Sequence, residues 1–197
     1  MEATAIRTDN ARPLAAATSP LARAFSTLLK VLPEFDRLGD GSDVIRDAAL
    51  LGIDIAQVAA ADVMLGRRSV SLLCISSRLW NSPDEMEVVF HLKRELYREG
   101  RDVLLVPEQF VRRQPRLENA AFLAGMPDVR ITGTERLSIL AYLGLYEAVP
   151  LSELAALISG DDPVSGILKL VVDGALEMNL DETILHSSMV RLARARS

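Results

Sequence analysis

The spacing of apolar residues in the last third of the chain predicts three helices followed by a hairpin. Apolar positions recur at helical spacing in three segments, residues 135–143, 151–158 and 164–172. Two further segments alternate between apolar and polar positions like strands, residues 175–180 and 184–190. Thr134 is a suitable N-cap for the first helix, and Pro163 is a favourable first residue for the third. This order predicts a winged helix-turn-helix domain over residues 134–192, with 164–172 as its recognition helix.

The preceding region predicts a mixed order of helices and strands. Ser19 and Pro20 begin a helix with an apolar face, a loop follows over residues 33–41, and residues 43–51 form either a short helix or an irregular segment. Strands are predicted at residues 53–58, 62–65, 69–76 and 101–106, with a turn at 66–68. Helices are predicted at residues 82–98 and 108–124, the second interrupted at Pro115. We therefore expect an α/β domain with a mixed sheet over residues 19–130, preceded by a mobile arm over the weakly patterned residues 1–18.

Composition narrows the class of protein. The 197 residues are 49% hydrophobic and 25% charged, which is ordinary for a globular protein, and the length fits two small domains. The net charge of −5 gives no general attraction to nucleic acid or to an anionic membrane. The single cysteine, Cys74, excludes an internal disulfide framework. Because the first ten residues lack a signal-peptide core and no apolar run reaches about 18 residues, we expect a cytoplasmic protein without a membrane span.

The charge of the predicted winged helix opposes a simple DNA-binding role. Residues 134–197 contain nine acidic and five basic side chains, whereas phosphate binding requires the opposite sign. Lys169 is the only cation in the predicted recognition helix. We favour docking of this module on another domain or on a protein partner, and direct contact of Lys169 with duplex DNA is the alternative.

Three arginines surround Pro115 and form the most basic cluster in the chain. Arg112, Arg113 and Arg116 lie within five residues, and guanidinium groups bind phosphates well. The alternative is that these arginines pair with nearby carboxylates or with the acidic C-terminal module of the same molecule. Such internal pairing would account for both the acidic module and the negative net charge.

The order of elements resembles a known enzyme family. The predicted hairpin over residues 62–76, followed by a helix and a further strand, resembles the PD-(D/E)XK nuclease core. With a winged helix after it, residues 19–192 resemble TnsA-like transposon endonucleases. The resemblance implies a restriction-endonuclease-like mixed sheet with flanking helices, plus a C-terminal winged helix-turn-helix domain. In that family a helix donates a Glu, a hairpin strand an Asp, and the next strand a Glu-x-Lys or Gln-x-Lys pair. The carboxylates bind divalent cations, which activate water, and the lysine polarises the nucleophile or the phosphate.

This chain departs from the family motif at most of those positions. Ala22 stands at the position of the helix carboxylate, whereas Asp62 retains the hairpin acid. Cys74 and Ser76 stand where the resemblance places the second ligand and the lysine. One carboxylate is too few to hold catalytic magnesium, because hard cations need several anionic oxygens. We therefore expect a degenerate site with no metal or cofactor and favour a protein that is not an enzyme.

Three functions remain open at this stage. The favoured one is a non-catalytic, nuclease-like structural or regulatory subunit that binds protein, double-stranded DNA or both. The second is an active endonuclease with a shifted register that uses Asp54 or Glu34, in which case Mg²⁺ or Mn²⁺ is the cofactor. The third is a winged-helix transcription regulator whose N-terminal domain senses a ligand. A homo-oligomer is compatible with all three.

Overall fold

The structure is a computed structural model that describes residues 19–32 and 35–193. The arm expected at residues 1–18 and the alternative ligand Glu34 lie outside the described residues. The elements of the first part are α1 (Pro20–Val31), β1 (Asp36–Gly39), α2 (Ser42–Leu50), the 3-10 helix η2 (Ile55–Gln57), β2 (Val58–Leu65), β3 (Arg68–Ile75), α3 (Ser77–Trp80), α4 (Pro83–Arg98), β4 (Val103–Pro107), α5 (Glu108–Val111) and α6 (Arg116–Ala124). Those of the second part are α7 (Gly133–Leu145), β5 (Val149–Pro150), α8 (Leu151–Ala155), α9 (Pro163–Val172), β6 (Leu176–Met178) and β7 (Met189–Leu192).

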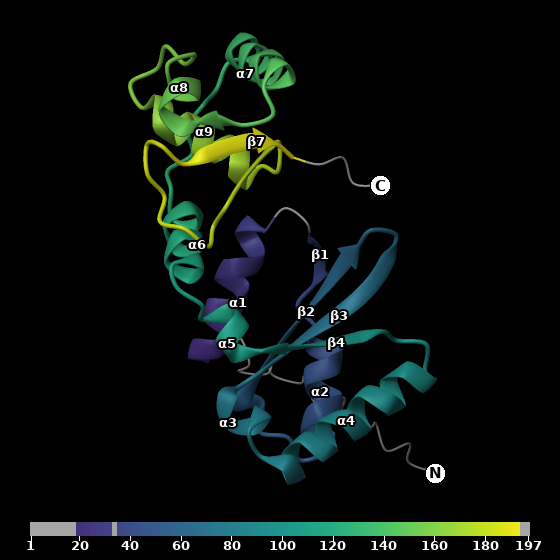
Figure 1. Cartoon of the computed structure of the whole chain (residues 1–197). Coiled ribbons are helices and arrows are strands. Elements are labelled where there is room, and N and C mark those ends of the chain that lie inside the picture. The colour runs from purple at the N-terminus through teal and green to yellow at the C-terminus, as the bar shows by residue number, and fades with distance from the viewer. Residues whose placement is uncertain (1–18, 33–34, 194–197) are drawn as a thin grey trace, which may run out of the picture.

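A four-stranded mixed sheet forms the centre of the first part (Figure 1). Its strand order is β1-β2-β3-β4; β1, β2 and β3 are antiparallel neighbours, and β4 runs parallel to β3. Parallel neighbours require a crossover connection, and α4 provides most of it. The expectation of a mixed α/β sheet with flanking helices is therefore confirmed.

The two faces of this sheet pack against different helices. Side chains alternate between faces along a strand. Ala61, Val63 and Cys74 join the cluster that contains the buried residues of α1, whereas Leu73 and Ile75 join the cluster of α2 and α4. Because these strands are covered on both sides, the face to which each side chain points decides which helix it meets.

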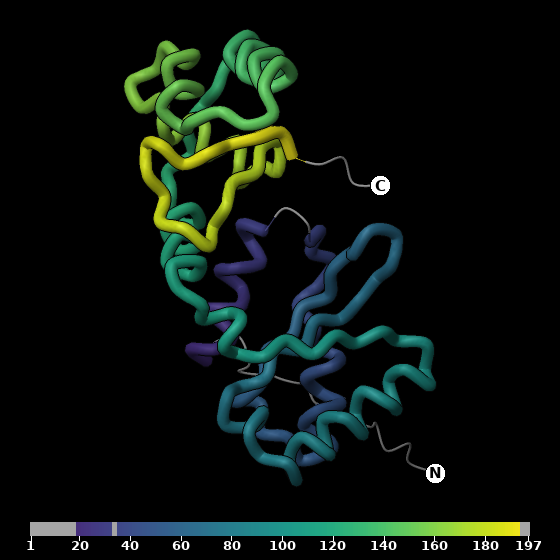
Figure 2. Tube along the Cα trace, in the orientation of Figure 1, coloured from purple at the N-terminus to yellow at the C-terminus, as the bar shows by residue number. Residues whose placement is uncertain are grey.

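The second part contains three helices and an antiparallel sheet of order β5-β7-β6. Its core continues into the first part, because buried residues of α1, α6 and α9 belong to one hydrophobic cluster. Figure 2 shows the chain leaving α6 for α7 and the yellow C-terminal segment returning beside α6. The boundary expected near residues 130–134 thus falls in a linker, but the apolar core crosses it.

Capping explains where several helices begin. The Ser19 hydroxyl accepts the Ala22 N–H, and Pro20 is the first residue of α1. Asp162 and Pro163 begin α9 in the same way. The expected cap of α7 is wrong by two residues, because Thr132 and not Thr134 caps it. Thr132 forms a reciprocal capping box with Glu135, so Thr134 lies inside the helix.

Two predicted strands and one predicted loop are wrong. The Asp54 carboxylate accepts the Ala56 N–H, so the segment predicted as strand 53–58 forms a 3-10 turn before β2. Within the expected loop 33–41, residues 36–39 form the edge strand β1. The strand predicted at 184–190 starts only at Met189. The carbonyls of His186 and Ser188 instead accept the first N–H groups of α8. None of the described helices has the length and apolar character needed to cross a membrane.

Candidate functional site

Asp62, the retained acid, lies in the middle of β2 and faces β3. Its Cα partner across the strands is Ser71, whose hydroxyl donates to the carboxylate at 2.5 Å. On the other side, a Cβ added to Gly39 of β1 would lie 3.0 Å from Asp62 Oδ2. The carboxylate is therefore half-buried between two neighbouring strands, with one oxygen occupied by a serine.

The structure does not bring the expected ligand positions together. Asp62 and Ser71 point to one face of the sheet, and Cys74, three residues after Ser71, points to the other. Ala22 lies on α1, which also packs on the Cys74 face. The interpretation of Ala22, Asp62 and Cys74 as one degenerate site is therefore wrong. The reason is the turn at Gly66, which has two residues and pairs Leu65 with Arg68, whereas a three-residue turn would have placed Cys74 on the face of Asp62.

The Cys74 thiol is not suited to bind a metal ion in this environment. The side chain is fully buried, and its desolvation, with a smaller contribution from the charge of Glu108, raises the pKa of the thiol to about 12. A thiol with this pKa stays protonated near neutrality, and the thiolate is the form that binds metals. Cys74 acts as a small apolar core residue.

Ser76 and Asp54 both have local structural partners. The Ser76 hydroxyl accepts the Leu79 N–H at 3.2 Å as the N-cap of α3, and it donates to Gln57 Oε1 at 3.1 Å. Asp54 is the N-cap of η2 and lies before the first paired residue of β2, whereas Asp62 lies in the middle of that strand. Over the described ranges 19–32 and 35–193, no group of three or more His, Cys, Asp or Glu side chains is arranged to hold a metal ion.

Glu108 is one of the nearby carboxylates with which the arginine cluster was expected to pair, and it also caps the chain after β3. It follows β4 and accepts the Ser77 N–H at 2.7 Å and Arg112 Nε at 2.5 Å. Partial burial alone would raise the pKa of the Glu108 carboxyl, but the hydrogen bonds from Ser77 and Arg112 outweigh it, and the pKa is lowered. Glu108 thus ties the ends of the parallel strands β3 and β4 together and occupies Arg112.

Arg116 forms the main polar contact between the two parts of the chain. Its Nε and Nη2 atoms donate to the two oxygens of Asp181 at 2.7 and 2.6 Å, and its guanidinium lies 4.6 Å from the centre of the Phe110 ring. Arg113 lies 3.8 Å from the same carboxylate. The Arg116 hydrogen bonds lower the pKa of Asp181. Of the two interpretations of the arginine cluster, internal pairing with the C-terminal module is the one that these contacts realise.

Asn119 is a second connection that the sequence analysis missed. It lies on α6 and is the only buried polar side chain among residues 19–32 and 35–193. Its amide donates to the carbonyls of Leu180 (2.9 Å) and Glu182 (2.7 Å). The buried amide thus finds two acceptors, as buried polar groups normally do, and the bond to Leu180 is itself buried. An isolated asparagine in an amphipathic helix gives no sequence signal for this role.

Helix α9 is not exposed as a recognition helix would be. Each of its ten residues is buried or half-buried, because it packs against α8, α6, α1 and β6. Lys169 Nζ lies 2.9 Å from Asp173 and 3.5 Å from Asp128. This packing matches the favoured docking of the module, and it argues against the alternative in which Lys169 contacts duplex DNA, because α9 is covered and two acids pair with Lys169.

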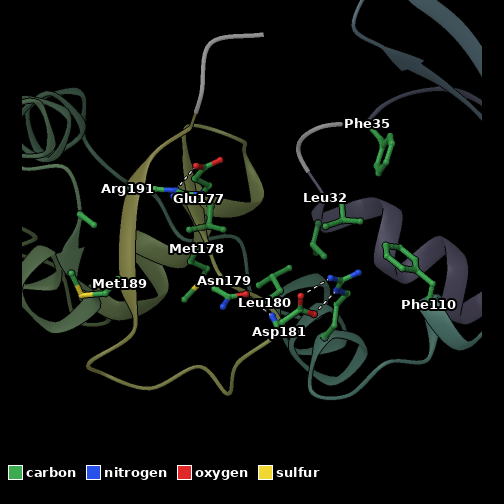
Figure 3. Close-up of a pocket in the computed structure, with 14 residues that line it drawn as sticks. Leu32, Phe35, Phe110, Glu177, Met178, Asn179, Leu180, Asp181, Met189 and Arg191 are labelled. Atoms are coloured by element: carbon green, nitrogen blue, oxygen red, sulfur yellow. Dashed lines mark hydrogen bonds and ion pairs between the residues drawn. The ribbon is translucent and has the colours of Figure 1, made fainter.

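A pocket of about 580 Å³ lies between α1 and the β6–β7 strands (Figure 3). Leu32, Phe110, Met178 and Met189 form much of its apolar lining. The charged side chains at the pocket are already paired with one another, as Arg116 with Asp181 and Arg191 with Glu177. The pocket therefore offers apolar surface but no uncompensated charge.

No family model, curated protein or solved structure matches this chain. Of the sequence-predicted contact residues, Arg113 and Arg116 meet at Asp181, Arg112 pairs with Glu108, and Lys169 lies apart from them on α9.

Proposed function

We propose that this protein is a non-catalytic relative of TnsA-like endonucleases that serves as a structural or regulatory subunit of a DNA-associated assembly. The order of elements supports the first half of this proposal. From α1 to β4 the main elements are helix α1, strand β1, helix α2, the antiparallel β2–β3 hairpin, the crossover helix α4 and strand β4, which is parallel to β3. The retained acid, Asp62, lies on a strand of the hairpin, as in the family that the sequence resembles.

The second part of the chain supports a winged helix. Its order is α7, β5, α8, α9, β6 and β7, with β7 between the other two strands. Three helices with a small antiparallel sheet of this kind are the parts of a winged helix-turn-helix module. Here the third helix packs inward against α6 and α1, which favours a role in joining the two parts over a role in a DNA groove.

The observation that carries the non-catalytic proposal is the position of Asp62. Its carboxylate bonds to Ser71, and the next residue of β3 on the same face is the apolar Leu73. A hydrolytic metal site needs further anionic oxygens at this place, and neither neighbour supplies one. Arg116 is paired with Asp181, and Lys169 is paired with Asp173. This pairing of both cations within the molecule favours a protein partner over DNA.

Titration calorimetry with Mn²⁺ tests the loss of the metal site. We expect wild type and Asp62→Asn to give the same trace, with no saturable binding tighter than about 1 mM. Saturable binding in the wild type that disappears in Asp62→Asn would refute the proposal and would revive the active endonuclease.

Fluorescence anisotropy with labelled duplex DNA tests the choice of partner. The variant of choice is Arg112→Ala combined with Arg113→Ala, because both side chains are exposed and the Arg116–Asp181 contact stays intact. We expect this variant to bind duplex as weakly as the wild type at low and moderate salt. A tight, salt-sensitive wild-type complex whose log–log salt slope falls by about two in the variant would instead show phosphate contacts.

A further inference from the structure

Two arginines converge on one carboxylate at the junction of the two parts of the chain. Arg116 donates two hydrogen bonds to the Asp181 carboxylate, and the same carboxylate lies 3.8 Å from Nη1 of Arg113 (Figure 3). Two positive charges therefore face one negative charge. The charge of Arg113 is consequently not balanced by a carboxylate of its own.

The two arginines differ in how they are held. The Arg116 guanidinium lies over the Phe110 ring and is largely buried, whereas the Arg113 side chain is exposed. A guanidinium presents five N–H donors in a planar fork that fits a phosphate as well as a carboxylate. One guanidinium is thus fixed in place by packing, and the other can reach an anion in solution.

The carboxylate belongs to the irregular loop between β6 and β7, residues 179–188, which is attached to α6 without the Asp181 side chain. The Asn119 amide donates to the backbone carbonyls of Leu180 and Glu182, and the Leu180 side chain is buried. The Asp181 side chain can therefore leave the arginines while the two parts of the chain stay joined.

Neighbouring charges define the limits of this site. Arg112 is held by Glu108, so it does not take part. Glu182 accepts a hydrogen bond from Asn179 instead of pairing with an arginine. Within residues 19–32 and 35–193, the carboxylate that pairs with Arg113 and with Arg116 is that of Asp181. Removal of this single carboxylate leaves two adjacent guanidinium groups open to an anion.

We propose that Arg113 and Arg116 form a binding site for a backbone phosphate of duplex DNA, and that the Asp181 carboxylate occupies this site in the free protein. A group in the same molecule is present at a high effective concentration, so a phosphate in solution competes poorly with it. The contact thus keeps duplex binding weak in the wild type. This inference rests on the DNA-associated role proposed above, and it adds a phosphate site and the side chain that blocks it.

Fluorescence anisotropy with labelled duplex DNA, comparing Asp181→Ala with the wild type, tests the proposal. We expect Asp181→Ala to bind at least about tenfold more tightly at low salt. Its log–log salt slope should be steeper by about two, because each phosphate contact contributes roughly 0.9. Adding Arg113→Ala to Asp181→Ala should remove about half of this increase in slope.

Asp47→Ala is the matched control. Asp47 accepts a hydrogen bond from Arg101 at 2.7 Å in another partly buried ion pair, so its removal changes the net charge by the same amount and also frees an arginine. We expect this variant to bind duplex as weakly as the wild type. Asp181→Asn removes the same charge as Asp181→Ala with a smaller change in shape, and it should tighten binding in the same direction.

Urea unfolding confirms that the variants fold and gives a second readout of the site. At equal ionic strength, inorganic phosphate should raise the unfolding midpoint of Asp181→Ala above its value in chloride, and it should leave the wild type unchanged. Stabilisation by phosphate without tighter duplex binding would overturn the assignment of the site to DNA.

Two further results would overturn the proposal. The first is duplex binding by Asp181→Ala and Asp181→Asn that is no tighter than that of the wild type, and the second is an equal gain in Asp47→Ala. Either result would leave the structural role proposed above intact. Conversely, Mn²⁺ binding through Asp62 would refute that role without bearing on this site.

Discussion

Replacing Arg116 or Asp181 tests how strongly the two parts of the chain are joined. The Arg116 side chain is only 15% exposed, and it makes two hydrogen bonds to one carboxylate. Exposed ion pairs contribute at most about 1 kcal/mol, whereas removing one partner of a buried pair costs about 3–5 kcal/mol. For this partly buried, bidentate pair we expect Arg116→Ala to cost about 2–3 kcal/mol of unfolding free energy, including its contact with Phe110.

A double-mutant cycle in urea unfolding isolates the pair. We expect a coupling free energy between Arg116→Ala and Asp181→Ala of about 1.5 kcal/mol at neutral pH. Arg113→Ala is the control; it is 59% exposed and 3.8 Å from Asp181, so it should cost no more than about 0.5 kcal/mol. Coupling near zero, or an Arg113 effect as large as that of Arg116, would refute the assignment of this contact as the main polar connection.

The same pair predicts a pH dependence. The Arg116 hydrogen bonds lower the pKa of the Asp181 carboxyl in the folded state, so the folded protein holds this proton less tightly than the unfolded chain. The resulting stability is fully present above the ordinary aspartate pKa of about 3.9 and is lost as pH falls through the lowered value. The coupling should therefore be unchanged between pH 7 and pH 5 and should shrink only below about pH 4. A coupling that already declines at pH 5–6 would contradict this cause.

Three further experiments test other parts of the structure. Gly41→Ala should destabilise the protein by at least about 3 kcal/mol in urea unfolding, because φ is +67° and the new Cβ would lie 2.5 Å from Ala60 Cβ. Gly52→Ala is the control; its φ is also positive but the space around it is open, so it should cost only about 1 kcal/mol. Equal effects of the two variants would count against the close approach at Gly41. Asn119→Leu should cost about 2–3 kcal/mol, since one buried and one part-buried carbonyl lose their donor, and a change below about 0.5 kcal/mol would show that water replaces the amide. The Cys74 thiol, with a pKa of about 12, should react with a thiol reagent at pH 8 only as fast as the protein unfolds, and rapid labelling of the native protein would contradict its burial.

Local signals explain which parts of the fold were predictable. Pro20 and Pro163 begin two helices, as their positions in the sequence indicated, and Pro83 is likewise the first residue of α4. Proline has no N–H to lose in the first turn and its φ suits the helix. In contrast, the apolar alternation after Ile53 was outweighed by the carboxylate of Asp54, which forms a turn with the backbone two residues later. Edge strand β1 has no buried residue, so no alternation revealed it.

The candidate site was less predictable because it depends on register. A hairpin turn of two residues instead of three changes the partner of Asp62 from Leu72 to Ser71 and moves Cys74 to the opposite face. The sequence contains Gly66 but does not determine the number of turn residues, whereas the structure gives Gly66 a positive φ, typical of a two-residue turn. The pairing of Arg116 with Asp181 spans 65 residues, so local spacing cannot predict it.

Incubation of the protein with supercoiled plasmid and Mn²⁺ shows whether a hydrolytic centre is present at Asp62. We expect the plasmid to stay intact with the wild type and with Asp62→Asn, since Asp62 has only Ser71 and Leu73 beside it on β3. Nicking or linearisation by the wild type that disappears in Asp62→Asn would instead identify an active nuclease.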